Sequence, residues 1–180
     1  MDHFIRTHNS DLADQLGNLL SRVTGMIDRY YEGVVPEAES SPSKGRLEEK
    51  ATGLFERMTL AMNDFNPSAA LAEVWELIGE ANRYVVEVEP WKLAKVREDD
   101  QNERKLATVL YEMIEVLRIA AWGIAAFMPS ASRSILEHLG VGSGTTRIEQ
   151  QLQWGGYPAG TKVAPAPPLF PKLEAAEPPA

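Results

Sequence analysis

The sequence predicts an all-α fold, an antiparallel bundle of five or six helices followed by an extended tail. Apolar residues recur at spacings of three and four in successive segments, which is the period of an amphipathic helix. Prolines and short polar loops separate these segments, and none of them alternates polar and apolar residues as a strand does. The last segment, 160–180, is rich in proline and predicts an extended conformation.

The first expected helix covers residues 3–31, with one apolar face at Leu12, Leu16, Leu19, Val23, Met26, Ile27 and Tyr30. A segment rich in Pro, Ser, Gly and Glu then predicts a loop up to residue 45. The second helix is expected over 46–64, with Leu47, Ala51, Leu54, Phe55, Met58 and Met62 on one stripe. Both helices are amphipathic, so each should cover a shared core.

Asn66 and Pro67 predict the start of a third helix over 67–86, since Asn caps helices and Pro suits the first helical position. Pro90 opens a short helical turn, and a long helix follows over 98–128. The far end of that helix is apolar nearly all round, so we expect it at the centre of the bundle. A shorter helix over 129–140 ends at Gly140. We assign 1–155 to the helical domain and 156–180 to a tail that packs on it or links onward.

The composition excludes several functions. The chain has 180 residues and no cysteine, so it forms no disulfide or thiolate metal site. No apolar run reaches the roughly 18 residues of a membrane span, and the first residues do not form a signal peptide, so we expect a cytoplasmic protein that does not enter a membrane. The net charge of −8 disfavours binding to DNA through its phosphates, so any nucleic-acid contact must be local.

No motif for catalysis is present. The sequence contains no phosphate-binding glycine loop, no zinc-protease signature and no nucleophile elbow. His3, His8 and His138 have no partners at ligand spacing, so we expect no metal site. The acidic residues are scattered, and we expect nearly all of them on solvated faces. The chain therefore carries no catalytic residue and no cofactor of its own.

Two groups of residues remain as binding candidates. Asn18 and Arg22 lie four apart on one helix face, and their planar polar groups suit recognition of base edges, although a surface pair without a role is the alternative. Trp91 beside Lys92 and Lys95 suits base stacking next to a phosphate, although the indole could simply cover the end of the bundle. The apolar stripe of the third helix contains Asn82, which we expect to be part-buried and hydrogen-bonded. Tyr84 could likewise cover the end of the bundle.

In combination these motifs resemble the anticodon-binding domain of class I aminoacyl-tRNA synthetases, in particular the methionyl-tRNA synthetases. The resemblance rests on "THNSDLADQLGNLLSR" at 7–22, "ANRY" at 81–84 and "PWKLAK" at 90–95. "AAFMPSASRSILEHLG" and "LFPKLE" resemble the last helices and the closing peptide of that family. Asp14, Gln15 and His8 depart from its usual residues.

The resemblance implies a class Ia helix bundle that reads the CAU anticodon of methionine tRNA, a single-stranded loop. It places anticodon recognition on Asn18, Arg22 and Trp91, with Lys92 and Lys95 as possible phosphate contacts. In the family, a separate catalytic domain ligates methionine to tRNA with ATP and Mg²⁺. Its signatures are absent here, so we expect this chain to be inactive alone and to be a piece of a longer protein whose catalytic domain is a partner.

Two alternatives stay open on the sequence. One is a helical module that docks another protein through exposed Trp and Leu faces. The other is the anticodon domain of a sister enzyme for Leu, Ile, Val or Cys.

Overall fold

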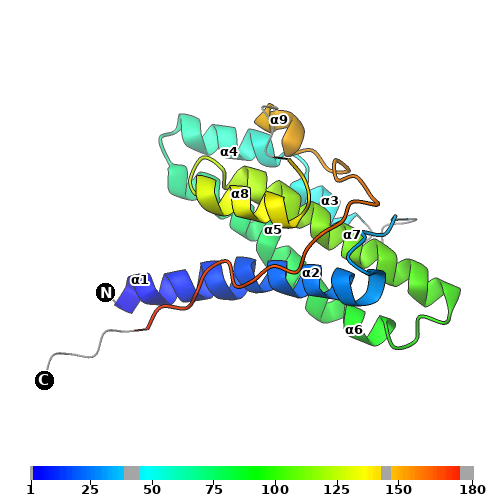
Figure 1. Cartoon of the computed structure of the whole chain (residues 1–180). Coiled ribbons are helices and arrows are strands. Elements are labelled where there is room, and N and C mark those ends of the chain that lie inside the picture. The colour runs from blue at the N-terminus through cyan, green and yellow to red at the C-terminus, as the bar shows by residue number, and fades with distance from the viewer. Residues whose placement is uncertain (1, 39–44, 143–146, 175–180) are drawn as a thin grey trace, which may run out of the picture.

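The computed structural model describes residues 2–38, 45–142 and 147–174. The regular structure of these residues is helical, and their only β-pairing is an isolated bridge between Val34 and Lys162. The long helical runs that follow one another in the chain run in opposite directions (Figure 1). The all-α antiparallel bundle is therefore confirmed.

The first helical run contains three elements, α1 (Asp2–Thr7), η1 (His8–Gly17) and α2 (Asn18–Tyr31). They form one continuous rod (Figure 1), so the expected extent is confirmed. The middle element is a π-helix, which the sequence analysis did not predict. Because its i→i+5 bonds change the angle between successive side chains, η1 shifts the helix faces that a 3.6-residue period predicts.

The expected helix over 46–64 is interrupted. It consists of α3 (Arg46–Ala51) and α4 (Leu54–Asn63), and Gly53 between them has a left-handed backbone with φ of 71°. Ion pairs join these two helices to α5 (Pro67–Val88), at 3.0 Å from Arg46 to Glu80 and at 2.7 Å from Arg57 to Glu73. The earlier arginine pairs with the later glutamate, so α3 and α4 run antiparallel to α5.

The start of α5 follows the sequence expectation. The side chain of Asn66 accepts a hydrogen bond from the Ala69 amide at 3.0 Å, and Pro67 is the first helical residue. At the other end, Glu89 adopts a left-handed conformation with φ of 49°. The chain then enters α6 (Pro90–Leu93).

The long helix α7 (Asp100–Gly123) is the central element, as expected. Its N-cap Asp99 accepts bonds from the amides of Gln101 and Asn102. Nearly every residue from Leu106 to Gly123 is buried. The remaining helices, α8 (Pro129–His138) and α9 (Ile148–Gln151), pack against it.

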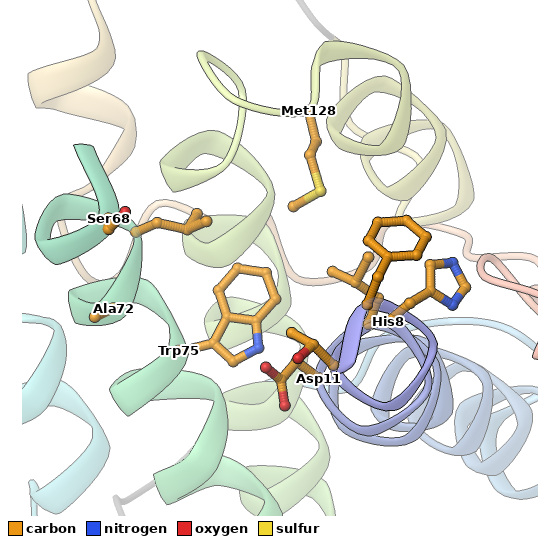
Figure 2. A pocket seen from close by; sticks show the side chains of 10 residues that line it. His8, Asp11, Ser68, Ala72, Trp75 and Met128 are labelled. Atoms are coloured by element: carbon orange, nitrogen blue, oxygen red, sulfur yellow. The ribbon is translucent and has the colours of Figure 1, made fainter. Parts of the chain in front are cut away.

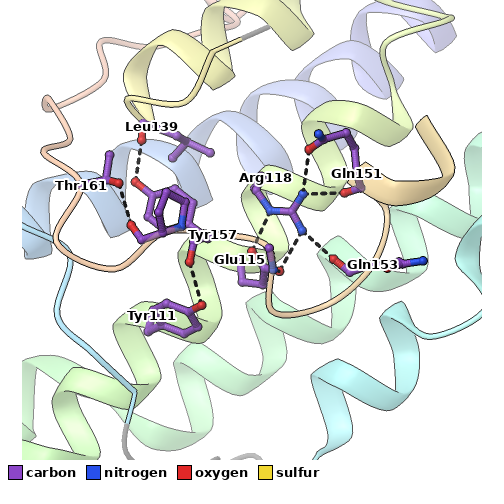
Figure 3. A network of polar contacts seen from close by, with 10 residues as sticks. Tyr111, Glu115, Arg118, Leu139, Gln151, Gln153, Tyr157 and Thr161 are labelled. Atoms are coloured by element: carbon purple, nitrogen blue, oxygen red, sulfur yellow. Dashed lines mark hydrogen bonds and ion pairs between the residues drawn. The ribbon is translucent and has the colours of Figure 1, made fainter. Parts of the chain in front are cut away.

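Two acidic residues lie inside the bundle, as exceptions to the expectation that nearly all of them lie on solvated faces. Glu112 and Glu115 are buried on α7. Glu115 pairs with Arg118 at 2.8 Å, and the Arg118 guanidinium also donates to the carbonyls of Gln151 and Gln153 (Figure 3). Buried charges of this kind require a complete set of partners. The pair thereby holds the segment after α9 onto the bundle.

The residues that follow α9 also pack on the bundle. Tyr157 is buried, donates from its hydroxyl to the Leu139 carbonyl at 2.5 Å and accepts from Tyr111 at its own carbonyl (Figure 3). Residues 163–174, here called the C-terminal strap, then run back along α2, η1 and α1 (Figure 1). The boundary at 155 between bundle and tail stays a prediction.

Candidate functional site

Asn18 and Arg22 lie one turn apart on α2. Asn18 is exposed and Arg22 is half-buried. Neither side chain has a hydrogen bond or ion pair with the part of the chain that the structure describes. The amide and the guanidinium thus keep their paired hydrogen-bonding groups for an outside ligand.

Trp91 is the second residue of α6, directly after Pro90. Pro90 is buried, and Trp91 is half-buried and packs against the hydrophobic core. The indole is thus neither fully exposed nor fully inside the core. Because Pro90 anchors the turn, part of the indole is covered and fixed in place, while the rest reaches the surface.

The two lysines near Trp91 differ in their surroundings. Lys92 is exposed and forms an ion pair with Glu89 at 2.6 Å, one turn earlier. Lys95 is exposed and has no ion pair with any described residue. Exposed pairs of this kind contribute little to stability, so both ammonium groups are accessible to a phosphate.

Contacts between α5 and the first helical run place α6 close to α2. Asn82 donates to the Gln15 carbonyl at 3.3 Å, which shows that the second half of α5 approaches the end of η1, just before α2 begins. Arg97, in the loop after α6, donates to the Tyr30 carbonyl at 2.7 Å near the end of α2. Trp91 and the Asn18–Arg22 face therefore lie in the same half of the bundle.

The loop after α6 is fixed by further contacts. The Arg97 guanidinium lies over the Tyr31 ring, 5.1 Å from its centroid, and pairs with Glu103 at 2.9 Å. Burial and the nearby Glu103 raise the pKa of Tyr31 above its usual value. These contacts secure the position of α6 relative to α2.

The C-terminal strap closes the other side of the Asn18 face. Asn9 makes two hydrogen bonds of 2.9 Å with the backbone of Leu173, one as donor and one as acceptor. Lys172 pairs with Asp14 at 2.8 Å. The Ala166 backbone bonds to Ser21 and Thr24, both at 3.1 Å. The strap thus follows the first helical run over several turns.

A cavity of about 700 Å³ lies between the strap and the first helical run. The helical side contributes small and polar residues, Ala13, Asp14, Gly17, Asn18 and Ser21. The strap contributes the segment 168–172. Asn18 is therefore part of this cavity as well as of the α2 face, which the sequence analysis did not predict. The closing "LFPKLE" motif is the only signal that pointed to this segment.

An apolar groove of about 490 Å³ lies elsewhere on the bundle, between α1, η1 and α5 (Figure 2). Its large apolar lining residues are Phe4, Leu12, Leu71, Trp75 and Met128. The Trp75 indole nitrogen is buried and has no hydrogen-bond partner in the described chain. Since Leu71 and Ser68 lie near the start of α5, the groove lies far from the α6 end.

The described residues contain no group of three His, Asp or Glu side chains that could hold a metal ion. His8 packs its ring edge-on to Phe170 of the strap, with 6.3 Å between the ring centroids. No helix in the described ranges is long and apolar enough to cross a membrane.

Comparison with known proteins supports the resemblance found in the sequence. Residues 57–121 match the DALR domain family. A methionine–tRNA ligase of Clostridium tetani is 39% identical over 172 residues, which cover 95% of this chain and 26% of that enzyme. The chain is homologous to part of methionine–tRNA ligase. A ligase of Caldanaerobacter subterraneus is 38% identical over 92% of the chain.

Solved structures of this ligase share the fold. The free methionyl-tRNA synthetase of Mycobacterium tuberculosis matches with a TM-score of 0.88 and 32% identity, over 96% of this chain and 34% of that enzyme. Its complex with methionyl-adenylate matches with a TM-score of 0.87. The chain thus spans about a quarter of the length of the methionine–tRNA ligases that it resembles.

Proposed function

We propose that this chain binds the anticodon loop of methionine tRNA and reads its CAU anticodon through Asn18, Arg22 and Trp91. The observation that carries the proposal is the similarity to methionine–tRNA ligases over nearly the whole chain. An anticodon is a single-stranded loop whose bases can be turned outward, stacked on an aromatic ring and bonded at their edges. The free polar groups of α2 and the indole of α6 suit those two interactions.

The divided environment of Trp91 supports a stacking role. The half that packs on the core fixes the indole before a base arrives, so little side-chain entropy is lost on binding. Stacking of one base is worth about 1–3 kcal/mol. A bidentate contact of Asn or Arg to a base edge gives about 1–3 kcal/mol of discrimination. A few such contacts suffice for a chain of net charge −8 to select one tRNA.

Lys92 and Lys95 supply local positive charge next to Trp91, although the chain as a whole is negatively charged. Both lie within one turn of Trp91 and reach solvent. A phosphate next to a base stacked on Trp91 would compete with Glu89 for Lys92. We propose that the two lysines neutralise that phosphate, which makes binding sensitive to salt.

The activity of the longer relatives is part of the same proposal. ATP, Mg²⁺ and methionine would be handled by a catalytic domain outside the residues of this chain, which we propose as its partner. The apolar groove in Figure 2 suits docking of that domain, since it exposes Phe4 and lies away from the α6 end. A role in tRNA charging implies a cytoplasmic location.

The test is binding of the full chain to an RNA stem–loop that carries the CAU anticodon. We expect saturable binding that weakens with salt and is lost when the three anticodon bases are changed. Stem–loops from the tRNAs for Leu, Ile, Val and Cys distinguish the sister enzymes. Equal binding of all stem–loops, or none, would contradict the proposal and favour a protein-docking module.

A further inference from the structure

The cavity beneath the C-terminal strap is a second feature of the Asn18 face. It opens between the strap and the first helical run, and both Asn18 and Lys172 line it. Its volume of about 700 Å³ lies in the range of about 300–1,000 Å³ that small-molecule sites occupy. A cavity of this size has room for a nucleotide.

The walls of the cavity have the chemistry that an unpaired nucleotide needs. Pro168, Leu169, Phe170 and Pro171 form an apolar wall against which a base can lie. Ser21 and Asn18 offer polar groups on the helical side. Lys172 is 63% exposed at its side chain, so its ammonium group can reach a phosphate.

We propose that this cavity is a second nucleotide site of the same surface. It takes one unpaired nucleotide of the RNA loop, with the base against Leu169 and Phe170 and the phosphate at Lys172. The inference rests on the proposed function, because continuity through Asn18 identifies the occupant. A loop read by Asn18 and Trp91 must continue past Asn18, and the cavity is the hollow that it meets there.

The ion pair between Asp14 and Lys172 allows a test, because the site predicts opposite effects on RNA binding for the two charges. Lys172 pairs with Asp14 at 2.8 Å, and the Asp14 side chain is 53% exposed. A phosphate at Lys172 competes with this carboxylate. Removing the Asp14 charge should therefore strengthen RNA binding, while removing the Lys172 charge should weaken it. If the ion pair only stabilised the structure, removing either charge should change RNA binding in the same direction.

The experiment measures binding of the CAU stem–loop to Asp14→Asn and Lys172→Ala. We expect binding of Asp14→Asn to tighten up to about fivefold, the range of an exposed ion pair. Lys172→Ala should weaken binding by a similar factor and reduce the salt slope by roughly 0.7, as loss of one phosphate contact does. Glu137→Gln and Lys105→Ala, exposed on α8 and α7, are the controls for charge alone.

A second variant fills the cavity. Ala13→Phe places a ring in it without changing Asn18 or Lys172. The binding partners are stem–loops that each lack one base. For wild type, binding should weaken when the base that stacks on Trp91 is missing, and also when the base that occupies the cavity is missing. Ala13→Phe should abolish the second sensitivity and retain the first. Circular dichroism checks that the variant folds, and the two charge variants decide the matter if it does not.

The outcomes separate the two proposals. If wild type does not distinguish the CAU stem–loop, the proposed function fails. If wild type does distinguish it, but Asp14→Asn and Lys172→Ala behave like their controls, the second site alone is overturned. A folded Ala13→Phe with an unchanged profile of base sensitivity would also overturn it.

Discussion

The side-chain amide of Asn82 joins two helices, donating to the Gln15 carbonyl at 3.3 Å and to the Ile78 carbonyl of its own helix at 3.0 Å. Asn82 is half-buried among apolar neighbours of α5. The bond to Gln15 fixes the register between α5 and the first helical run. It thereby fixes how far α6, and Trp91 on it, lie along α2 from Asn18.

Replacement of Asn82 is expected to weaken both stability and binding. Asn82→Ala removes the bond between the helices and should lower the free energy of unfolding by about 0.5–1.5 kcal/mol. Binding of the CAU stem–loop should weaken because Trp91 and Asn18 lose their fixed spacing. Urea unfolding and a binding titration measure the two effects. Asn63→Ala, an exposed site on α4, is the control and should change neither.

Breaking the buried Glu115–Arg118 pair is expected to have a larger effect on stability. Arg118→Met leaves Glu115 charged and without its partner inside the bundle, so the free energy of unfolding should fall by about 3–5 kcal/mol. Release of the Gln151 and Gln153 carbonyls should also increase amide exchange in the segment after α9.

A double variant separates charge from packing at this pair. Glu115→Leu with Arg118→Met removes both charges and should recover a large part of the lost stability, since apolar residues can replace a buried pair at little cost. If the double variant were less stable than Arg118→Met alone, the uncompensated charge would not be the main cause.

The buried tyrosines predict loss of stability at alkaline pH. Burial raises the pKa of Tyr157 and of Tyr84 in the folded protein. A raised folded-state pKa stabilises the fold at pH values below the unfolded pKa of about 10. This stabilisation is lost as the pH rises toward the folded-state pKa. Urea midpoints should therefore fall between pH 9 and about pH 12, in the range set by these raised pKa values.

Tyr157→Phe tests this cause. At pH 8 it should cost about 0.5–1.5 kcal/mol through the lost bond to the Leu139 carbonyl. Above about pH 10 the variant should lose less stability than wild type, because it has one fewer phenol to ionise. Parallel losses for the two proteins would show that Tyr157 does not drive the alkaline effect.

The fold was largely predictable because its helices carry strong periodic signals. Asn66, Pro67 and Pro129 mark helix starts through local chemistry that tertiary contacts did not override. The break at Gly53 and the π-helix before Asn18 were missed. Both arise from backbone geometry that leaves the apolar pattern almost unchanged.

The candidate site was only partly predictable. Spacing placed Asn18 and Arg22 on one helix, but it could not show that Trp91 is half-buried. The cavity beneath the strap depends on contacts between Asn9 and Leu173, which are more than 160 positions apart. Helical periodicity carries no information about contacts at such a separation. The polar residues within η1 gave no sign that they hold a tail.

The most direct test of the account is whether Asn18, Arg22 and Trp91 read the anticodon. The measurement is binding of the CAU stem–loop, and of stem–loops with one anticodon base changed, to Asn18→Ala, Arg22→Ala and Trp91→Ala. Asn63→Ala and Arg133→Ala, both exposed and on other helices, are the controls. Each site variant should bind the CAU loop roughly 5- to 150-fold more weakly, equivalent to about 1–3 kcal/mol, and should discriminate less between loops. Site variants that bind and discriminate like wild type would contradict the account.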